Sequence, residues 1–386
     1  MALYLESGYT SLNKKNEELC GDKVESIIKD DRMTIVLADG LGSGVKANIL
    51  ATLTSKILCT MIANEISIEE CVETMIQSLP ICKVRGLAYS TFTVIHIDKL
   101  GKGYLFEFDN PQAIYLHQGR CQDFARNSLN ILGKIVYKTE LQLEVDDYIL
   151  MMSDGAIHAG VGSTLNFGWE RQQIMDYINR VYEPEMSARS VACLVAAACN
   201  DLYLDHPGDD TTIAGIRVRE TMNVSLMVGP PVDQHQDDFH IGNFLKGEGK
   251  KVVCGGTSSL IVARYLNKEV KTVFDYIDSD VPPIGYIDGI DLTTEGVLTL
   301  RKLLQLSEKY LSTSDLTAKS FKKKDGASLL ADLLFEKATH VTFFVGQSIN
   351  SAHQGLPIDI TMKLKLVEAL SNNLRLMGKE VVVNYD

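Results

Sequence analysis

Two stretches share a pattern that decides how the first half of the chain folds: IVLADGLGSG from Ile35 to Gly44, and MMSDGAIHAG from Met151 to Gly160. In each, an apolar run that predicts a buried strand stops at an Asp-Gly pair. A single Asp-Gly pair indicates only a turn, because it is common turn chemistry. Asn or Ser could make the same turn without placing a charge at the end of a buried strand. The repetition therefore suggests that the two carboxylates have a functional role beyond forming a turn.

Length and composition limit the class of protein. The 386 residues predict two or three domains, and 45% apolar with 23% charged residues is typical of a globular protein. The net charge of -12 argues against a general nucleic-acid binder, which would carry a basic face. It leaves room for a bound cation or a positively charged partner.

The cysteines and the N-terminus predict a cytoplasmic protein. No cysteine pair has CxxC spacing, so we interpret the eight cysteines as reduced packing thiols. They are Cys20, Cys59, Cys71, Cys82, Cys121, Cys193, Cys199 and Cys254. The first residues do not read as a signal peptide. No uncharged apolar run approaches the ~18 residues of a membrane span, so no membrane association is expected.

Residues 1–220 predict an α+β domain. Strands are expected at 33–40, in five runs between 89 and 153, and at 211–218; helices are expected at 45–65, 67–79, 168–182 and 187–204. Tight turn signals separate the middle strands. This order predicts a sandwich of two antiparallel sheets flanked by helices.

Residues 221–386 predict a second domain of α/β layers with a substantially parallel sheet, because strands and helices alternate. Among these elements are a strand expected at 270–277 and a helix expected at 293–311. The boundary is placed near Glu220. Pro230-Pro231 and the polar stretch after them are expected to interrupt regular structure.

Four aspartates in the first domain lie beside glycine at the edge of an apolar element. They are Asp22 in CGDKVES, Asp39 in LADGLG, Asp154 in MSDGA and Asp209 in HPGDDTTI. Carboxylates brought together repel unless something positive lies between them. Oxygen ligands select Mg²⁺ or Mn²⁺ over zinc. Gly40 and Gly155 would let backbone or a hydrated ion approach. Gly42 and Gly44 keep the loop small before a helix whose N–H groups are expected to be available for an anion.

The ordered set GD, ADGLGSG, STFTVIHID, MMSDG and GDDTTI resembles the PPM class of metal-dependent serine/threonine protein phosphatases, specifically its bacterial SpoIIE-like branch. The resemblance covers roughly residues 1–219. It implies a two-sheet sandwich holding two or more Mn²⁺ or Mg²⁺ ions and acting on a phosphorylated protein. It also implies that Asp22 bridges the ions, that Asp39, Asp154 and Asp209 are further ligands, and that Gly40 contributes its carbonyl oxygen. Asp210 falls where relatives have Asp or Asn.

The implied chemistry is attack by a metal-activated water on a phosphomonoester, without a cysteine nucleophile. Some relatives hold the substrate phosphate with an arginine near the N-terminus. Here only Lys14 and Lys15 lie near that place, and neither is an obvious counterpart. His158 is either a general acid or a loop histidine at the edge of the site. By analogy, the helix after GLGSGVKAN is a regulatory element.

Several other segments have two interpretations. Gly255-Gly256-Thr257-Ser258-Ser259, between a strand and a helix, is an anion loop or an ordinary capped turn, and Cys254 beside it is buried or reactive. The stretch 347–359 is a ligand loop or a plain connection. Lys322-Lys323-Lys324 predicts a solvated loop. His235, Asp237, Asp238 and His240 are metal-like residues in an expected flexible linker, interpreted as non-binding.

Two functions follow from these patterns. The first is a protein phosphatase with a regulatory C-terminal domain. The alternative is a catalytically weak regulatory protein that senses a ligand or partner through residues 221–386. The sequence leaves open the substrate, the ligand of the second domain, the choice of Mn²⁺ or Mg²⁺, and whether the chain forms a homodimer.

Overall fold

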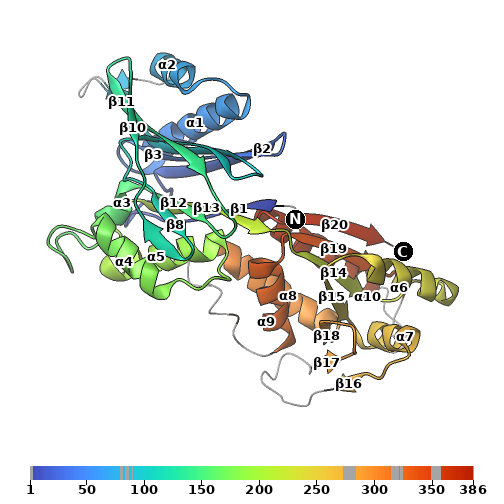
Figure 1. Cartoon of the computed structure of the whole chain (residues 1–386). Coiled ribbons are helices and arrows are strands. Elements are labelled where there is room, and N and C mark those ends of the chain that lie inside the picture. Colours follow the sequence, from blue (N-terminus) through green and yellow to red (C-terminus); the bar gives the residue numbers. More distant parts are fainter. Residues whose placement is uncertain are drawn as a thin grey trace. The chain divides into compact units, whose positions relative to one another are not determined.

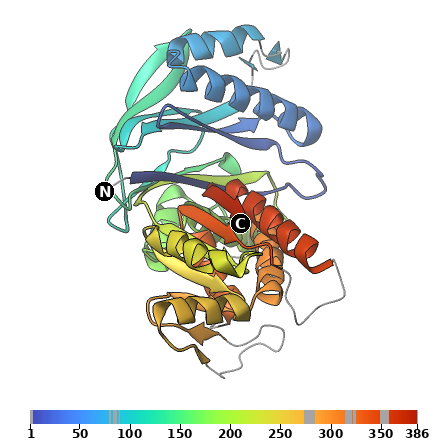
Figure 2. The ribbon, with the colours of Figure 1, turned by 90° about the vertical axis from the view of Figure 1, so that its right-hand side faces the viewer.

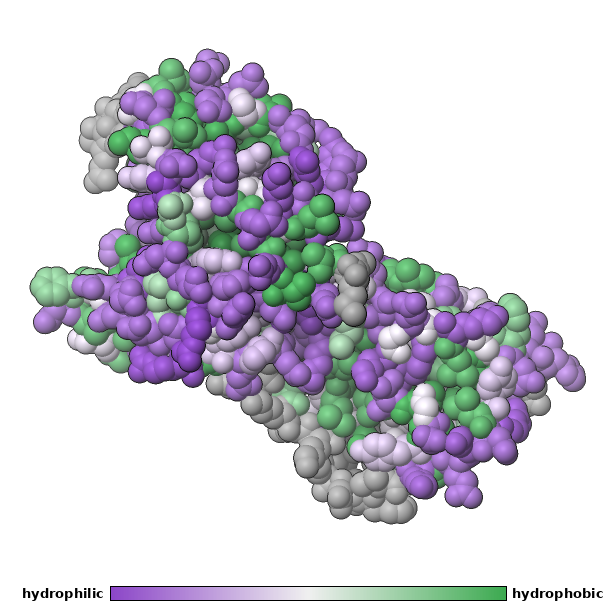
Figure 3. Space-filling view, in the orientation of Figure 1, coloured by the Kyte–Doolittle hydropathy of each residue, from purple (hydrophilic) through white to green (hydrophobic). Residues whose placement is uncertain are grey.

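The computed structural model describes residues 3–78, 81–82, 87–88, 90–272, 284–313, 321, 325–348 and 358–385. The chain forms two compact units, Met1–Glu220 and Thr221–Asp386 (Figure 1). On the face shown in Figure 3, hydrophilic residues cover most of the surface, with scattered apolar patches.

The N-terminal unit is built around two antiparallel sheets, one over the other, with helices outside them (Figure 2). The five-stranded sheet has the order β1 (Leu3–Leu12), β13 (Thr211–Glu220), β12 (Tyr148–Met152), β8 (Ile114–His117) and β9 (Arg120–Gln122). The six-stranded sheet has the order β10 (Asn127–Ile131), β11 (Lys134–Gln142), β7 (Lys102–Phe108), β6 (Ser90–Asp98), β3 (Arg32–Gly40) and β2 (Asp22–Lys29). A small pair, β4 (Ile81–Cys82) and β5 (Leu87–Ala88), stands apart from both.

Strand β3 has a continuous apolar run because both of its faces are covered. Ile35 and Leu37 point into the core between the two sheets. Val36, between them, packs in the core formed with the outer helices. Successive strand residues point to opposite faces, so a strand buried on both sides has no polar alternation. Burying one such aliphatic side chain contributes about 1.5–3 kcal/mol.

The helices of this unit are α1 (Gly44–Ala63), α2 (Ile68–Ser78), α3 (Asp154–Ile157), α4 (Arg171–Val181) and α5 (Ala188–Leu202). Helix α1 contacts β2, β3 and β6, and α5 contacts β1 and β13. Among the described residues, α1 is the one helix whose length and composition would let it cross a membrane. Here it packs on the sheet with residues such as Ala47, Ala51 and Leu58 fully buried.

The C-terminal unit is a layered α/β structure whose central strands are parallel. The sheet has the order β16 (Lys271–Thr272), β17 (Gly285–Tyr286), β18 (Leu292–Thr294), β15 (Lys250–Cys254), β14 (Asn223–Val228), β19 (His340–Val345) and β20 (Glu380–Tyr385). The helices are α6 (Asp237–Lys246), α7 (Gly256–Leu266), α8 (Val297–Ser312), α9 (Gly326–Ala331) and α10 (Ile358–Leu376), with a 3₁₀ turn at Gln234–Gln236 and a π-helical turn at Asp332–Lys337. Separate apolar clusters lie on the two faces of the sheet.

The structure confirms both predicted fold classes and corrects three details. Strands β1 and β2 were not predicted. The expected linker around His235 contains α6, where Asp237 is buried and pairs with Arg264 (Oδ2 to Nη2, 3.0 Å). Thr293 and Thr294, expected in a helix, lie in strand β18, and the helix begins at Val297.

The cysteines agree with their interpretation as packing thiols. None of the seven whose side chains are described forms a disulfide with another described cysteine, and five of them are buried: Cys59, Cys71, Cys193, Cys199 and Cys254. Lys322-Lys323-Lys324, most of the stretch 347–359 and most of the strand expected after Val270 lie outside the described residues.

Candidate active site

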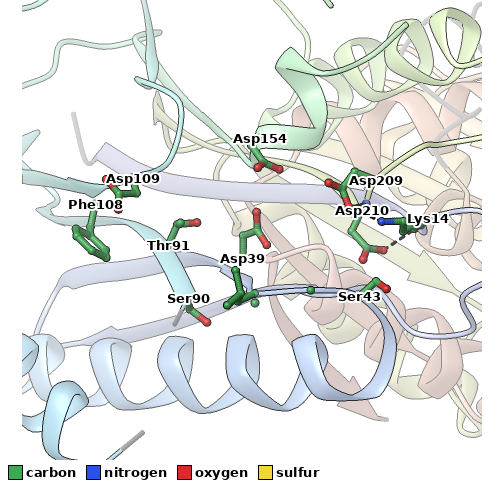
Figure 4. A pocket seen from close by; sticks show the side chains of 13 residues that line it. Lys14, Asp39, Ser43, Ser90, Thr91, Phe108, Asp109, Asp154, Asp209 and Asp210 are labelled. Carbon is green, nitrogen blue, oxygen red and sulfur yellow. Dashed lines mark hydrogen bonds and ion pairs between the residues drawn. The ribbon is translucent and has the colours of Figure 1, made fainter. Parts of the chain in front are cut away.

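A cavity of about 450 Å³ opens where several strands of the N-terminal unit end (Figure 4). Its lining includes Asp39, Asp154, Asp209 and Asp210, and Figure 4 shows the carboxylates of the first three facing a common space. Among the described residues that line the cavity, Lys14 is the one that is basic. Segments as far apart in the sequence as those of Asp39 and Asp210 thus bring like charges into one cavity.

Asp22 and Asp39 are neighbours across the β2–β3 ladder. They lie directly opposite each other at the end of the strand pair, where facing side chains in an antiparallel sheet come within about 5 Å. Asp22 is buried, and its Oδ1 has no hydrogen-bond partner among the described residues.

Asp154 begins helix α3, directly after β12. The preceding residue, Ser153, is fully buried and joins two strands at the site. Its Oγ donates to Asp22 Oδ2 at 2.7 Å and accepts from the Thr212 backbone N–H at 2.8 Å. Ser153 therefore fixes the orientation of the Asp22 carboxylate from the neighbouring sheet.

Asp209 and Asp210 stand just before β13. The Asp209 Oδ1 lies 3.4 Å from Lys14 Nζ, and both side chains are partly exposed. Asp210 Oδ1 accepts from the Lys14 backbone N–H at 3.0 Å, while its buried Oδ2 has no partner among the described residues. The structure thus places Asp210, whose role the sequence left open, beside the four predicted aspartates.

Burial and mutual repulsion change how these carboxyls titrate. Burial, with the negative charges of Asp22, Asp154 and Asp209, raises the pKa of Asp39 to about 9. Burial also raises the pKa of Asp22 to about 7, against the lowering effect of its hydrogen bond from Ser153. The pKa of Asp154 is raised by burial and by Asp209. The folded site therefore disfavours its own full ionisation.

Two glycines let the backbone come close enough to build the site. A Cβ on Gly40 would lie 2.0 Å from the Ala47 carbonyl oxygen, so only glycine lets α1 approach the end of β3. A Cβ on Gly155 would lie 2.1 Å from the Asp210 carbonyl oxygen. The glycine of each Asp-Gly pair thus serves close approach.

The donor set fits a hard divalent cation. The candidate ligands are oxygens, and two buried carboxylate oxygens, on Asp22 and Asp210, lack partners among the described residues. As placed, however, no three His, Cys, Asp or Glu side chains of the described residues form a group that could hold one ion. A shared ion would therefore require the carboxylates to rotate together.

Sequence reasoning missed part of the cavity. The opposite wall comes from Ser90, Thr91, Phe108 and Asp109, brought there by β6 and β7. Ser90 and Thr91 begin the STFTVIHID motif but were given no role at the site, and Phe108 and Asp109 belong to none of the motifs. Lys14 was noticed but given no role. The expectation that the α1 N-terminus is open to an anion is weakened by Glu17, whose Oε1 accepts from Ser43 Oγ at 3.0 Å.

His158 lies at the margin of the site. Its Nδ1 is 3.9 Å from Asp154 Oδ2, its side chain is half-exposed, and it stands outside the residues that line the cavity. This placement supports a loop histidine more than a general acid.

The raised pKa of Asp39 predicts a pH-dependent stability of the metal-free chain. Below about pH 4 its carboxyl is neutral in both states, but between about pH 4 and 9 it ionises only in the unfolded chain. Between about pH 4 and 9, rising pH should therefore lower the free energy of unfolding of the native chain relative to that of Asp39→Asn. Above about pH 9, the difference between the two free energies should stay constant. Denaturant unfolding in chelator, followed through the buried single tryptophan, Trp169, measures this. Parallel pH profiles would contradict the account.

The family model described as stage II sporulation protein E (SpoIIE) matches residues 29–219. No curated protein matches the chain.

Solved structures of PP2C-type phosphatase domains are similar to the chain. One is the PP2C phosphatase domain with a fragment of the regulatory domain of SpoIIE from Bacillus subtilis, at 17% identity over 56% of this chain and 64% of that one, with a TM-score of 0.47. Another contains the RsbU and RsbW domains of a Mycobacterium tuberculosis protein, at 17% identity over 63% and 68%, with a TM-score of 0.46. A third is the catalytic domain of the serine/threonine protein phosphatase PstP in complex with two manganese ions, at 15% identity over 56% and 100%, with a TM-score of 0.37.

These likenesses are distant, and the chain spans 64% of the B. subtilis structure that it matches. The assignment therefore depends on the family match, which covers most of the N-terminal unit and includes Asp39, Asp154 and Asp209. The family match over residues 29–219 supports a SpoIIE-like phosphatase domain of the PPM class in the N-terminal unit.

Proposed function

We propose that the N-terminal unit hydrolyses phosphoserine or phosphothreonine on a protein substrate with the help of divalent cations. The observation that carries this proposal is the convergence of Asp39, Asp154, Asp209 and Asp210 on one cavity, with Asp22 paired to Asp39 beside it. Raised pKa values and unpartnered buried oxygens accompany this convergence. Such an arrangement is costly for a fold unless cations offset it.

The ligands proposed for Mn²⁺ or Mg²⁺ are carboxylates and one backbone carbonyl. They are Asp22, Asp39, Gly40, Asp154 and Asp209, with Asp210 added from the structure. When bound, a pair of such ions supplies an activated water and offsets charge on the phosphoryl oxygens.

The chain's own residues would prepare the cavity for this chemistry. Ser153 holds one oxygen of Asp22 through a buried hydrogen bond, while the other oxygen, Oδ1, has no partner among the described residues. Lys14 carries the positive charge in the lining and is free to reach a phosphate, because its contact with Asp209 is long, at 3.4 Å. Thr91 and Phe108 form the facing wall, where the side chain that carries the phosphate would lie.

The cysteine beside Asp22 is poorly suited to act as a nucleophile. Cys20 lies beside Asp22, and its pKa is raised to about 12 by burial and by the charges of Asp22 and Asp210. A thiol with that pKa supplies almost no thiolate near neutral pH. This favours attack by water over a covalent phospho-enzyme.

We further propose that the C-terminal unit is regulatory and that the chain acts in the cytoplasm. The alternative, a catalytically weak protein that senses a ligand through this unit, predicts little turnover even when Mn²⁺ is bound. Both functions use the same fold, and activity measurements separate them.

Asp39→Asn should lower the Mn²⁺-dependent hydrolysis of an aryl phosphate by about 100-fold or more, because it removes a proposed ligand at nearly constant shape. Steady-state kinetics with and without Mn²⁺ measure the loss. The matched control is Asp31→Asn, an exposed aspartate in a turn paired with Lys99, which should keep full activity. Equal, metal-independent rates in native chain and Asp39→Asn would reject the enzyme.

Lys14→Met should raise KM for a phosphopeptide by roughly tenfold, the value expected for one charge-assisted hydrogen bond to a phosphate. Lys14→Arg should recover most of the affinity because it restores the charge. An unchanged KM in Lys14→Met would show that the lysine only neutralises Asp209. Mn²⁺ affinity, measured in parallel, separates a binding defect from disturbance of Asp209 and Asp210.

A further inference from the structure

The carboxyl ends of the parallel strands in the C-terminal unit meet at one edge of the sheet. Register pairs Val228 with Cys254 and with Val345, and Cys254 with Thr294, so these strands end in one row. In the strand order β18-β15-β14-β19-β20, β15 and β18 lie on one side of β14. The next two strands along the chain, β19 and β20, lie on the opposite side of β14. Open sheets of this kind bind ligands outside this edge.

At this edge, helix α7 begins without a capping side chain. Its N-cap is Gly255, and Gly256, Thr257 and Ser258 form the first turn. Their backbone N–H groups have no acceptor inside the helix, because none lies a turn earlier. The Gly255 N–H bonds to the Thr294 carbonyl oxygen at 2.9 Å, which ties the loop to β18. Gly256 and Thr257 are exposed.

Gly255 leaves the start of α7 without a side chain that would cover it. Its φ of +124° is one that residues with a side chain rarely adopt, so the position stays without a Cβ. The first atom that a Cβ there would meet is the Ser258 Oγ, 3.5 Å away. A Cβ on Gly256 would meet nothing within 4 Å. The loop is therefore open to a small group at the start of the helix.

The Ser258 hydroxyl is the second observation that points to a ligand. The residue is 1% exposed, and its Oγ has no hydrogen-bond partner among the described residues. An unpaired buried hydroxyl costs about 1–3 kcal/mol. Because this hydroxyl lies 3.5 Å from the position that a Cβ on Gly255 would take, an anion oxygen bound beside Gly255 would accept from it and from the nearby N–H groups.

The charged and reactive side chains at this edge of the sheet limit which ligand the loop could bind. Glu295 Oε2 accepts from the Leu298 N–H at 3.0 Å, so the start of α8 already has its own carboxylate. Cys254 is buried, and burial raises the pKa of its thiol to about 12, which leaves it unsuited to nucleophilic chemistry. Lys363, also buried, donates from Nζ to the Gly346 carbonyl oxygen after β19 and adds positive charge to this edge.

We propose that the Gly255–Ser258 loop and the α7 N-terminus bind the phosphate group of a small phosphorylated molecule. Helix N-termini suit a phosphate because aligned N–H groups and the helix dipole both favour negative charge. The site would give the C-terminal unit a ligand chemically related to the substrate of the N-terminal unit. The proposal does not depend on phosphatase activity.

The test is calorimetric titration of the full-length chain in chelator, carrying Asp39→Asn so that metal-dependent binding is suppressed. The probes are inorganic phosphate, glycerol 3-phosphate and acetate. The two phosphate compounds should bind and acetate should not. If free phosphate bound and glycerol 3-phosphate did not, the assignment to a phosphorylated metabolite would be wrong.

Matched variants locate the binding. Gly256→Glu places a carboxylate at the open start of α7 and should abolish phosphate binding, whereas the uncharged Gly256→Gln should retain it. Ser258→Ala should weaken binding about tenfold through loss of one hydrogen bond to a charged group. Thr299→Ala, which removes another unpartnered buried hydroxyl in the first turn of α8, should change nothing. Equal affinities in Gly256→Glu and Gly256→Gln, or no binding by the native loop, would overturn the proposal.

Discussion

Repulsion among buried carboxylates is the constraint on which the N-terminal unit depends. Asp22 and Asp39 face each other across a strand pair, and Asp154, Asp209 and Asp210 reach them from other elements. A fold that gathers these charges loses stability wherever they ionise, unless cations lie between them. Protons offset the charge in part, which is what the raised pKa values of Asp22 and Asp39 express.

The two-sheet sandwich holds the aspartates together because the strands that carry them are packed in apolar cores. Strand β3 is covered on both faces, so the end of β3 is held firmly and Asp39 cannot move away from its neighbours. Gly40 and Gly155 allow backbone carbonyls to pack where any side chain would collide. Ser153 then joins the two sheets through Asp22 and Thr212. Rigidity around the carboxylates is therefore a property of the core as much as of the site.

The positions of the main aspartates and of the strands that carry them could be predicted from the sequence. Asp39 and Asp154 each follow a strand whose apolar run is unmistakable, so the strand end and the carboxylate were located together. Lys14 and the wall at Thr91 could not be placed, because their position depends on how β1, β6 and β7 pair across long separations. Strand β2 was missed because its polar face hides the alternation. Helix α6 was missed because its buried Asp237 and His240 imitate a polar linker.

Proton release on Mn²⁺ binding tests the central claim most directly. Calorimetric titration of the full-length chain at pH 7 in buffers of different ionisation enthalpy counts the protons released. Because the pKa of Asp39 lies near 9, the account predicts saturable binding that releases about one proton or more per chain. Asp39→Asn should release fewer. Absence of saturable Mn²⁺ binding, or binding without proton release, would contradict the account.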